Sequence, residues 1–450
     1  MTVSTIHLAD DRQYTQSFRE RLALNADHTV SVPRSHVVEV APTLPPFSKI
    51  NRFAKERSLT FDEALLGMIY VLAGSNHSVR AMVTDRLVDI YGTDTVTDNE
   101  SLIARATVFL EGMAMRECLV GLTPEEIAGL AVGGLADCVV HLSLGCVTET
   151  CGMGADRGFG AQFSEMKTIN ASTLTALVLA SLQVPAIKHG SYGNTSKVGS
   201  TDAVGLLGIP RTFVDYDAMM CYFREHGFLY LEAGATKTIH DLSHLIKIET
   251  VNHLVGPMSV PVSSDTLLCK VIGINHHVDP VTVVEAYNLL HKLGYQTMGG
   301  ILTINGLPAD CDTSSHEGLF RLTVLDEVSP FGTLVAVGSG AEYFGTCIIE
   351  DEDFGAELTR LEQIEVPNTA EGIRCANEAA LTGEDLHLSR YLAKNAALAL
   401  VASGKLDQRF VDDVDYRRTL LKQAFVTCFG AITSGRTWEF VQKCQAPEIN

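Results

Sequence analysis

The sequence predicts an α/β protein built from a small all-helical domain and a large α/β domain with a largely parallel central sheet. Helix-start signals and helical spacing fill the region from about 50 to 142. Apolar runs of strand length then alternate with helical segments, a pattern typical of a parallel sheet. We expect an N-terminal extension over 1–46, the helical domain over 47–142, joined by a helical segment near 203–245, and the large domain over 143–450.

The composition is that of a globular protein and excludes some partners. With 450 residues, 46% hydrophobic and 20% charged, the chain can bury two or three structural units. A net charge of −20 opposes binding to nucleic acids and anionic membranes, so we expect neither as a partner. The N-terminus has neither a basic start nor an apolar core, so we expect no signal peptide. The longest apolar run, 174–187, is too short to span a bilayer. Eleven cysteines without a CxxC pair indicate reduced thiols in a cytoplasmic protein.

Local signals define the individual elements. Thr60 with Glu63, and Thr123 with Glu126, are capping boxes that begin helices. The helix predicted at 280–293 is expected to end at Gly294. The other predicted elements are strands at 184–187, 267–274, 297–304 and 334–337, and helices over 370–400 and 416–443.

Three segments carry groups suited to phosphate chemistry. The first joins the glycines of 151–158 to polar residues before a helix at 168–173, where backbone amides can meet an anion. The second, 188–202, has two lysines, three glycines and several hydroxyls. The third, 325–330, has adjacent carboxylates that can bind Mg²⁺ beside a polyphosphate. Each segment also has a purely structural interpretation. The first could be a tight turn with a helix cap, the second a surface loop, and the third a pair of solvated surface charges.

Five segments, taken in order, resemble the anthranilate phosphoribosyltransferase family, whose large domain is similar to that of pyrimidine nucleoside phosphorylases. They are Gly152-Met-Gly-Ala-Asp156, Asn170-Ala-Ser-Thr173, Lys188-His-Gly190 with Ser196–Asp202, Asn252–Pro257, and Leu325-Asp-Glu327. The likeness extends over roughly residues 50–443, with insertions near 75–115 and 308–324.

The resemblance implies an Mg²⁺-dependent phosphoribosyltransferase, which is a glycosyltransferase, that uses phosphoribosyl pyrophosphate and forms homodimers through its small domain. It assigns the binding of phosphoribosyl pyrophosphate to Gly152, Gly154, Asp156, Asn170, Ser172, Thr173, Lys188 and Ser200. It assigns metal binding to Ser172, Asp326 and Glu327, and catalysis to Lys188, Asp326 and Glu327.

Departures from the family pattern concentrate at the acceptor side. Ser191-Tyr192 replaces an Asn-Arg pair of the family, and no arginine occurs between Arg224 and Arg321. An arginine fork suits the carboxylate of anthranilate, so we expect another small aromatic or heterocyclic acceptor, unless Arg157 or Arg224 reaches the same space. The candidate acceptor-binding residues are Tyr192, His189 and His244.

Two other functions remain open at this point. A nucleoside phosphorylase of the same fold would use phosphate in place of pyrophosphate, and the acidic pair Asp326–Glu327 disfavours it. A non-catalytic paralogue that binds nucleic acid is disfavoured by the charge of −20.

Overall fold

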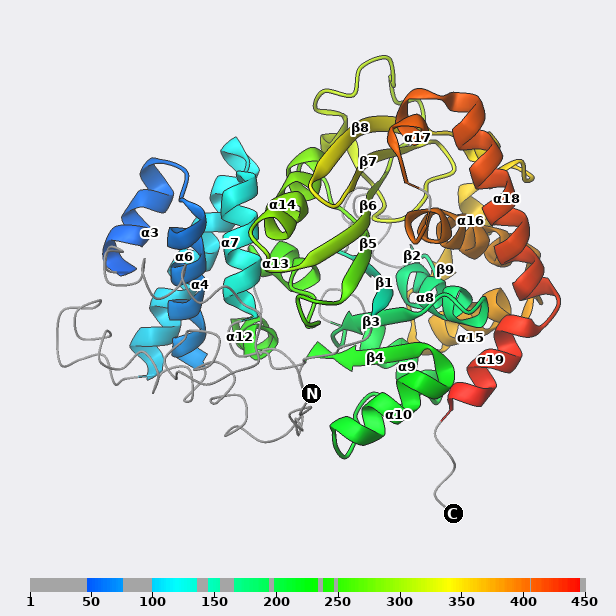
Figure 1. The fold of residues 1–450 in the computed structure, drawn as a ribbon, viewed down its shortest axis with the longest axis horizontal. Helices are drawn as coiled ribbons and strands as arrows, with labels where there is room; N and C mark the ends of the chain where they lie inside the picture. The colour runs from blue at the N-terminus through cyan, green and yellow to red at the C-terminus, as the bar shows by residue number, and fades with distance from the viewer. Residues whose placement is uncertain are drawn as a thin grey trace. The chain divides into compact units, whose positions relative to one another are not determined.

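The computed structural model describes residues 47–75, 99–135, 145–153, 166–193, 198–233, 238–246, 250–404 and 406–445. These residues form two compact units (Figure 1). The first unit draws on residues 1–144, 233–266 and 285–297, and the second on 145–232, 267–284 and 298–450. The extension expected over 1–46 lies outside the described residues.

The described part of the first unit is helical. Its helices are α3 (Phe47–Glu56), α4 (Phe61–Ser75), α6 (Asn99–Val120), α7 (Pro124–Gly134), α12 (Thr238–Ile246), α13 (Asn252–Met258) and the end of α14 (Pro280–Lys292). Both predicted capping boxes are confirmed. The Thr60 N–H donates to Glu63 Oε2 (2.9 Å) and the Glu63 N–H to Thr60 Oγ1 (3.3 Å), and α7 begins with the same exchange at Thr123 and Glu126.

Close helix packing in the first unit depends on small residues. Residues 63–73 of helix α4 are buried, and the helix packs on α7. At Gly133 an added Cβ would lie 2.6 Å from Met68 Cβ, and at Gly129 it would overlap the Phe61 carbonyl oxygen. Segments distant in sequence complete this packing, since Ser259 Oγ donates to the Ala131 carbonyl over 2.9 Å.

The second unit is built on a seven-stranded sheet of order β4-β3-β1-β5-β6-β7-β8. Its strands are β1 (Cys146–Gly152), β3 (Ala186–Gly190), β4 (Phe228–Glu232), β5 (Leu267–Gly273), β6 (Thr297–Gly306), β7 (Thr333–Ser339) and β8 (Glu342–Ile349). The pairs β4–β3, β3–β1 and β1–β5 are parallel, whereas β6–β7 and β7–β8 are antiparallel. A second, two-stranded sheet pairs β2 (Met166–Lys167) with β9 (Val366–Pro367).

Helices pack around this sheet (Figure 1). They are α8 (Ala171–Ser181), α9 (Ser200–Leu206), α10 (Tyr216–His226), α15 (Ala370–Thr382), α16 (Leu386–Ala402), α17 (Gln408–Asp412), α18 (Val414–Thr433) and α19 (Arg436–Cys444). Helix α16 contacts both α8 and α18, and its apolar residues lie within the main hydrophobic core. The core of this unit is therefore formed largely by helices from the end of the chain.

The α/β fold class with a largely parallel sheet is confirmed, and several details differ from the sequence prediction. Strand β3 begins at Ala186 and includes Lys188, so this lysine lies in a strand and not after one. The segment near 203–245, expected to be helical, also contains β4. The two closing helical segments are each divided by a glycine with positive φ, Gly383 (+79°) and Gly435 (+82°), a conformation that glycine adopts without strain. None of the described helices is long and apolar enough to cross a membrane.

We predict that Gly129→Ala destabilises the first unit by about 1–3 kcal/mol, the typical cost of overpacking a core. The added methyl would overlap the Phe61 carbonyl. The matched control is Gly112→Ala in α6, where nothing lies within 4 Å of the added Cβ, and which should gain about 0.5–1 kcal/mol. Denaturant unfolding measures both, and equal effects of the two substitutions would contradict the packing described here.

Candidate active site

Two adjacent parallel strands end in glycine at the same edge of the sheet. Gly152 of β1 pairs with Gly273 of β5, and Asp326 lies against both. An added Cβ at Gly152 would overlap Asp326 Oδ2, and one at Gly273 would overlap the Asp326 carbonyl. Ligands bind at the carboxyl ends of strands in open α/β sheets. The acidic pair therefore lies where a ligand is expected, and both glycines are needed for it to be there.

The second acidic residue is held from the end of the chain. Tyr391 Oη donates to Glu327 Oε2 over 2.6 Å, and Asn395 Oδ1 accepts from the Val328 N–H over 3.1 Å. Both side chains belong to α16. The orientation of the acidic loop thus depends on a helix that sequence reasoning did not connect with it.

The polar residues before α8 are fixed by reciprocal hydrogen bonds. Asn377 Oδ1 accepts from the Asn170 N–H (3.0 Å), and Asn377 Nδ2 donates to Asn170 Oδ1 (2.9 Å). The Ser172 carbonyl accepts from Thr150 Oγ1 of β1 (2.6 Å). Thr173 is fully buried, and its hydroxyl has no hydrogen-bond partner in the described part of the chain. The helix start therefore lies next to β1, near the point where that strand ends.

Strand β3 contributes Lys188 and leads to Ser200. Lys188 is 1% exposed, and its Nζ donates to the His189 carbonyl and lies 3.8 Å from Cys151 Sγ. An added Cβ at Gly190 would lie 2.6 Å from Ser200 Cβ, so Ser200 packs on the end of the strand. The Asp202 carboxylate closes the connecting loop by accepting from the N–H groups of Gly193 and Gly199, each over 2.8 Å.

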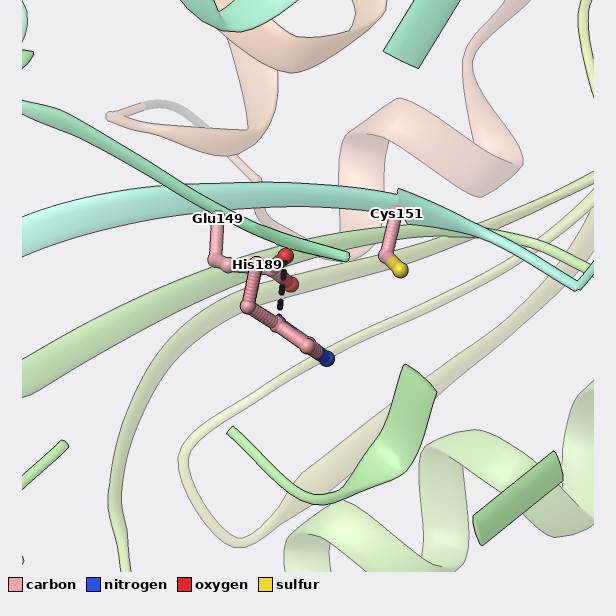
Figure 2. Close-up of side chains that lie close together, drawn as sticks. All are labelled: Glu149, Cys151 and His189. Atoms are coloured by element: carbon pink, nitrogen blue, oxygen red, sulfur yellow. Dashed lines mark ion pairs between the residues drawn. The ribbon is translucent and has the colours of Figure 1, made fainter. Parts of the chain in front are cut away.

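A buried network of charges links three strands of this sheet. Glu149 Oε1 lies 3.0 Å from His189 Nδ1, as Figure 2 shows, and Glu149 Oε2 accepts from Lys270 Nζ of β5. The Glu149 and Lys270 side chains are fully buried. Burial raises the pKa of Glu149, but Lys270 and His189 outweigh it and hold that pKa below its ordinary value. Glu149 is therefore a carboxylate, and it forms an ion pair with the His189 imidazole.

Glu149, Cys151 and His189 also form a group whose possible ligand atoms lie within 4.8 Å of one another (Figure 2). Such a set can hold a metal ion in principle. Here the carboxylate already binds the Lys270 ammonium, and the thiol lies 3.8 Å from the Lys188 ammonium. A divalent cation would face both positive charges at short range. We therefore assign the group to the buried charge network and not to a metal site.

The acceptor-side candidates are less completely defined. Tyr192 is 38% exposed, and its hydroxyl lies 3.5 Å from Arg211 Nη1, with the guanidinium 5.9 Å from the ring centroid. Burial and the Glu232 carboxylate raise the pKa of the Tyr192 phenol. His244 lies on α12, but its side chain is outside the described part of the structure. The donor-side candidates Gly154 and Asp156 lie wholly outside the described residues.

The contacts place several of the site residues proposed from sequence on or next to β1 and β3. Gly152 lies on Asp326, the Ser172 carbonyl accepts from Thr150 of β1, and Ser200 packs on Gly190 at the end of β3. Sequence reasoning missed five residues at this site: Glu149, Lys270, Asn377, Tyr391 and Asn395. A lysine and a glutamate inside apolar strands were a usable signal, because buried charges need partners.

Comparisons with known proteins identify the relatives of this chain. The model for the a/b domain of the glycosyl transferase family matches residues 160–297. The chain is 28% identical over 305 residues to an anthranilate phosphoribosyltransferase of Methanococcus vannielii, covering 67% of this chain and 83% of that protein. It is 30% identical over 295 residues to one of Aeropyrum pernix, covering 63% of this chain and 74% of that protein.

A solved structure has the same fold. Anthranilate phosphoribosyltransferase from Saccharomyces cerevisiae, in complex with PRPP and Mg, superposes with a TM-score of 0.59 at 19% identity. The match covers 89% of this chain and 96% of that one. At this identity the likeness concerns the fold alone.

The sheet, the helix start beside it and the acidic pair, together with the matched family model, define a glycosyltransferase, an enzyme of the phosphoribosyltransferase class. Within that class, the chain belongs to the anthranilate phosphoribosyltransferase family, as a divergent member.

We predict that Lys270→Met and Glu149→Gln each destabilise the protein by about 3–5 kcal/mol, because each leaves a buried charge without its partner. The double substitution should cost much less than the sum of the two single ones. Denaturant unfolding of the three variants measures this. Glu371→Gln, which removes one partner of the exposed pair with Arg374, is the control and should change the free energy of unfolding little, because solvent screens an exposed ion pair. Strictly additive losses would contradict the pairing.

Proposed function

We propose that this enzyme transfers the phosphoribosyl group from phosphoribosyl pyrophosphate to a small aromatic or heterocyclic acceptor other than anthranilate, and releases pyrophosphate with the help of Mg²⁺. The observation that carries the proposal is Asp326, which rests on the glycine ends of β1 and β5, with Glu327 next to it in the sequence. The names of its relatives support phosphoribosyl transfer, and the yeast relative was solved with PRPP and Mg.

The residues present fit a magnesium ion. Mg²⁺ prefers one or two carboxylates together with phosphate oxygens and waters, and Asp326 and Glu327 are both partly exposed at the sheet edge. We propose that these two residues and Ser172 hold the ion. When bound, the ion supplies positive charge that offsets the negative charge of the pyrophosphate leaving group.

The side chains of this protein would do the rest by binding and orientation. In the reaction, the bond between the anomeric carbon and a pyrophosphate oxygen breaks, and its electron pair leaves with the pyrophosphate. We propose that the Lys188 ammonium stabilises that charge, and that Gly152, Gly154, Asp156, Asn170, Thr173 and Ser200 bind the donor. This proposal is supported by the position of Lys188 Nζ, which lies 3.8 Å from the Sγ of Cys151, the residue before Gly152 in β1.

The acceptor side is proposed to differ from that of the relatives. Tyr192 offers a ring for stacking and a hydroxyl for hydrogen bonding, and Arg211 lies against it. We keep His189 and His244 as further acceptor-binding candidates. His189 Nδ1 lies 3.0 Å from Glu149 Oε1, so the Nε2 atom of this ring is the one that would meet an acceptor.

We also propose that the first unit is the small helical domain and that it forms a homodimer in the cytosol. Helix α6 exposes an apolar stripe of Val108 (49%), Met115 (55%) and Leu119 (74%) at helical spacing, which suits a second copy of the chain. A reducing compartment fits the cysteines in the described ranges, all of which are free thiols.

We predict that phosphoribosyl pyrophosphate binds tightly only with Mg²⁺, because Asp326 and Glu327 would otherwise face its phosphates as like charges. Calorimetry with Mg²⁺ and with EDTA measures the difference, and Glu327→Gln should abolish most of it. The exposed Glu362→Gln is the control. Equal affinity under both conditions would remove the acidic pair from the site.

We predict that anthranilate is a poor acceptor, with kcat/KM below about 10⁴ M⁻¹s⁻¹, the lower end of ordinary enzyme efficiency. No arginine lies between Arg224 and Arg321 to form a bidentate pair with its carboxylate, and Arg211, the arginine beside Tyr192, already contacts the phenol of that side chain. Loss of anthranilate fluorescence in the presence of phosphoribosyl pyrophosphate measures the rate. A parallel screen of pooled aromatic acids and heterocyclic bases provides the positive comparison, and ordinary turnover of anthranilate would overturn this part of the proposal.

A further inference from the structure

Two side chains of α16 form hydrogen bonds to the acidic loop, residues 325–330. Tyr391 and Asn395 are four residues apart and so lie on the same face of the helix. Tyr391 Oη donates to Glu327 Oε2 (2.6 Å), and Asn395 Oδ1 accepts from the next backbone N–H, that of Val328 (3.1 Å). Asn395 Nδ2 donates to the Tyr391 carbonyl over 3.0 Å, which ties the two contacts together.

The phenol is a permanent donor in a rigid setting. Tyr391 is 1% exposed and belongs to the main hydrophobic core. A tyrosine phenol ordinarily carries its proton at neutral pH, since its ordinary pKa is about 10. A carboxylate can only accept from it. The bond therefore fixes which way Glu327 turns, and a buried helix supplies the rigidity.

We propose that Tyr391 is a positioning residue that orients the Glu327 carboxylate for Mg²⁺ binding. This inference rests on the proposed function, in which Glu327 is a metal ligand. The physical reason is that a half-buried glutamate has several rotamers, and holding one oxygen selects the rotamer that presents the other. Partners that orient metal ligands in this way typically change metal affinity or activity 10–100-fold when they are lost.

The test is Tyr391→Phe, which removes the hydroxyl and keeps the ring in the core. We expect the affinity for Mn²⁺, followed by electron paramagnetic resonance in the presence of phosphoribosyl pyrophosphate, to fall by about tenfold. Binding of phosphoribosyl pyrophosphate in EDTA should not change. The matched control is Tyr222→Phe, which removes a phenol that donates to the Cys444 carbonyl over 2.8 Å and should leave Mn²⁺ affinity unchanged.

A double-mutant cycle separates positioning from a purely structural role. If Tyr391 acts through Glu327, then Tyr391→Phe adds no further loss of Mn²⁺ affinity in a Glu327→Gln background. A lower melting temperature with unchanged Mn²⁺ affinity, or full additivity in the cycle, would overturn the inference alone. Failure of the wild-type enzyme to bind Mn²⁺ and phosphoribosyl pyrophosphate together would overturn the proposed function, and this inference with it.

Discussion

The close approach of the Asp326 backbone and side chain to Gly152 and Gly273 sets the geometry of the whole site. Any side chain at either glycine would overlap Asp326, so the acidic loop can rest on the sheet only because two neighbouring strands both end without a Cβ atom. The helix start at Asn170 is joined to β1 through the bond from Thr150 Oγ1 to the Ser172 carbonyl. A methyl group on either glycine would displace the acidic loop from the ends of these two strands.

The interior below this edge carries more charge than an ordinary sheet. Glu149 binds Lys270 and His189, while Lys188 lies beside Cys151. Such groups are costly to bury unless they are paired, and here they are paired across β1, β3 and β5. The protein as a whole carries a net charge of −20, so the cationic groups around the proposed donor site are a local exception to its overall charge.

Much of the fold could be predicted because short motifs and local patterns encode it. The capping boxes at Thr60 and Thr123 follow from four residues each, and the parallel sheet follows from strand-length apolar runs. Lys270, Asn377 and Tyr391 could not be assigned, because their partners are between 64 and 207 residues away in the sequence. Arg211 was overlooked beside Tyr192 for a similar reason, since α9 and the following turn bring it there. The domain limits, the roles of the site residues and the acceptor stay predictions.

The first unit is discontinuous along the chain, and this affects the order in which the protein can fold. Its segments end at residues 144, 266 and 297, and Tyr295 from the last of them packs on Phe61 of α4 with 5.3 Å between ring centroids. During synthesis, the packing of the early helices can therefore be completed only after most of the chain has left the ribosome. Contacts of such sequence separation slow folding and leave apolar surfaces exposed meanwhile, so the nascent chain is a natural client for chaperones.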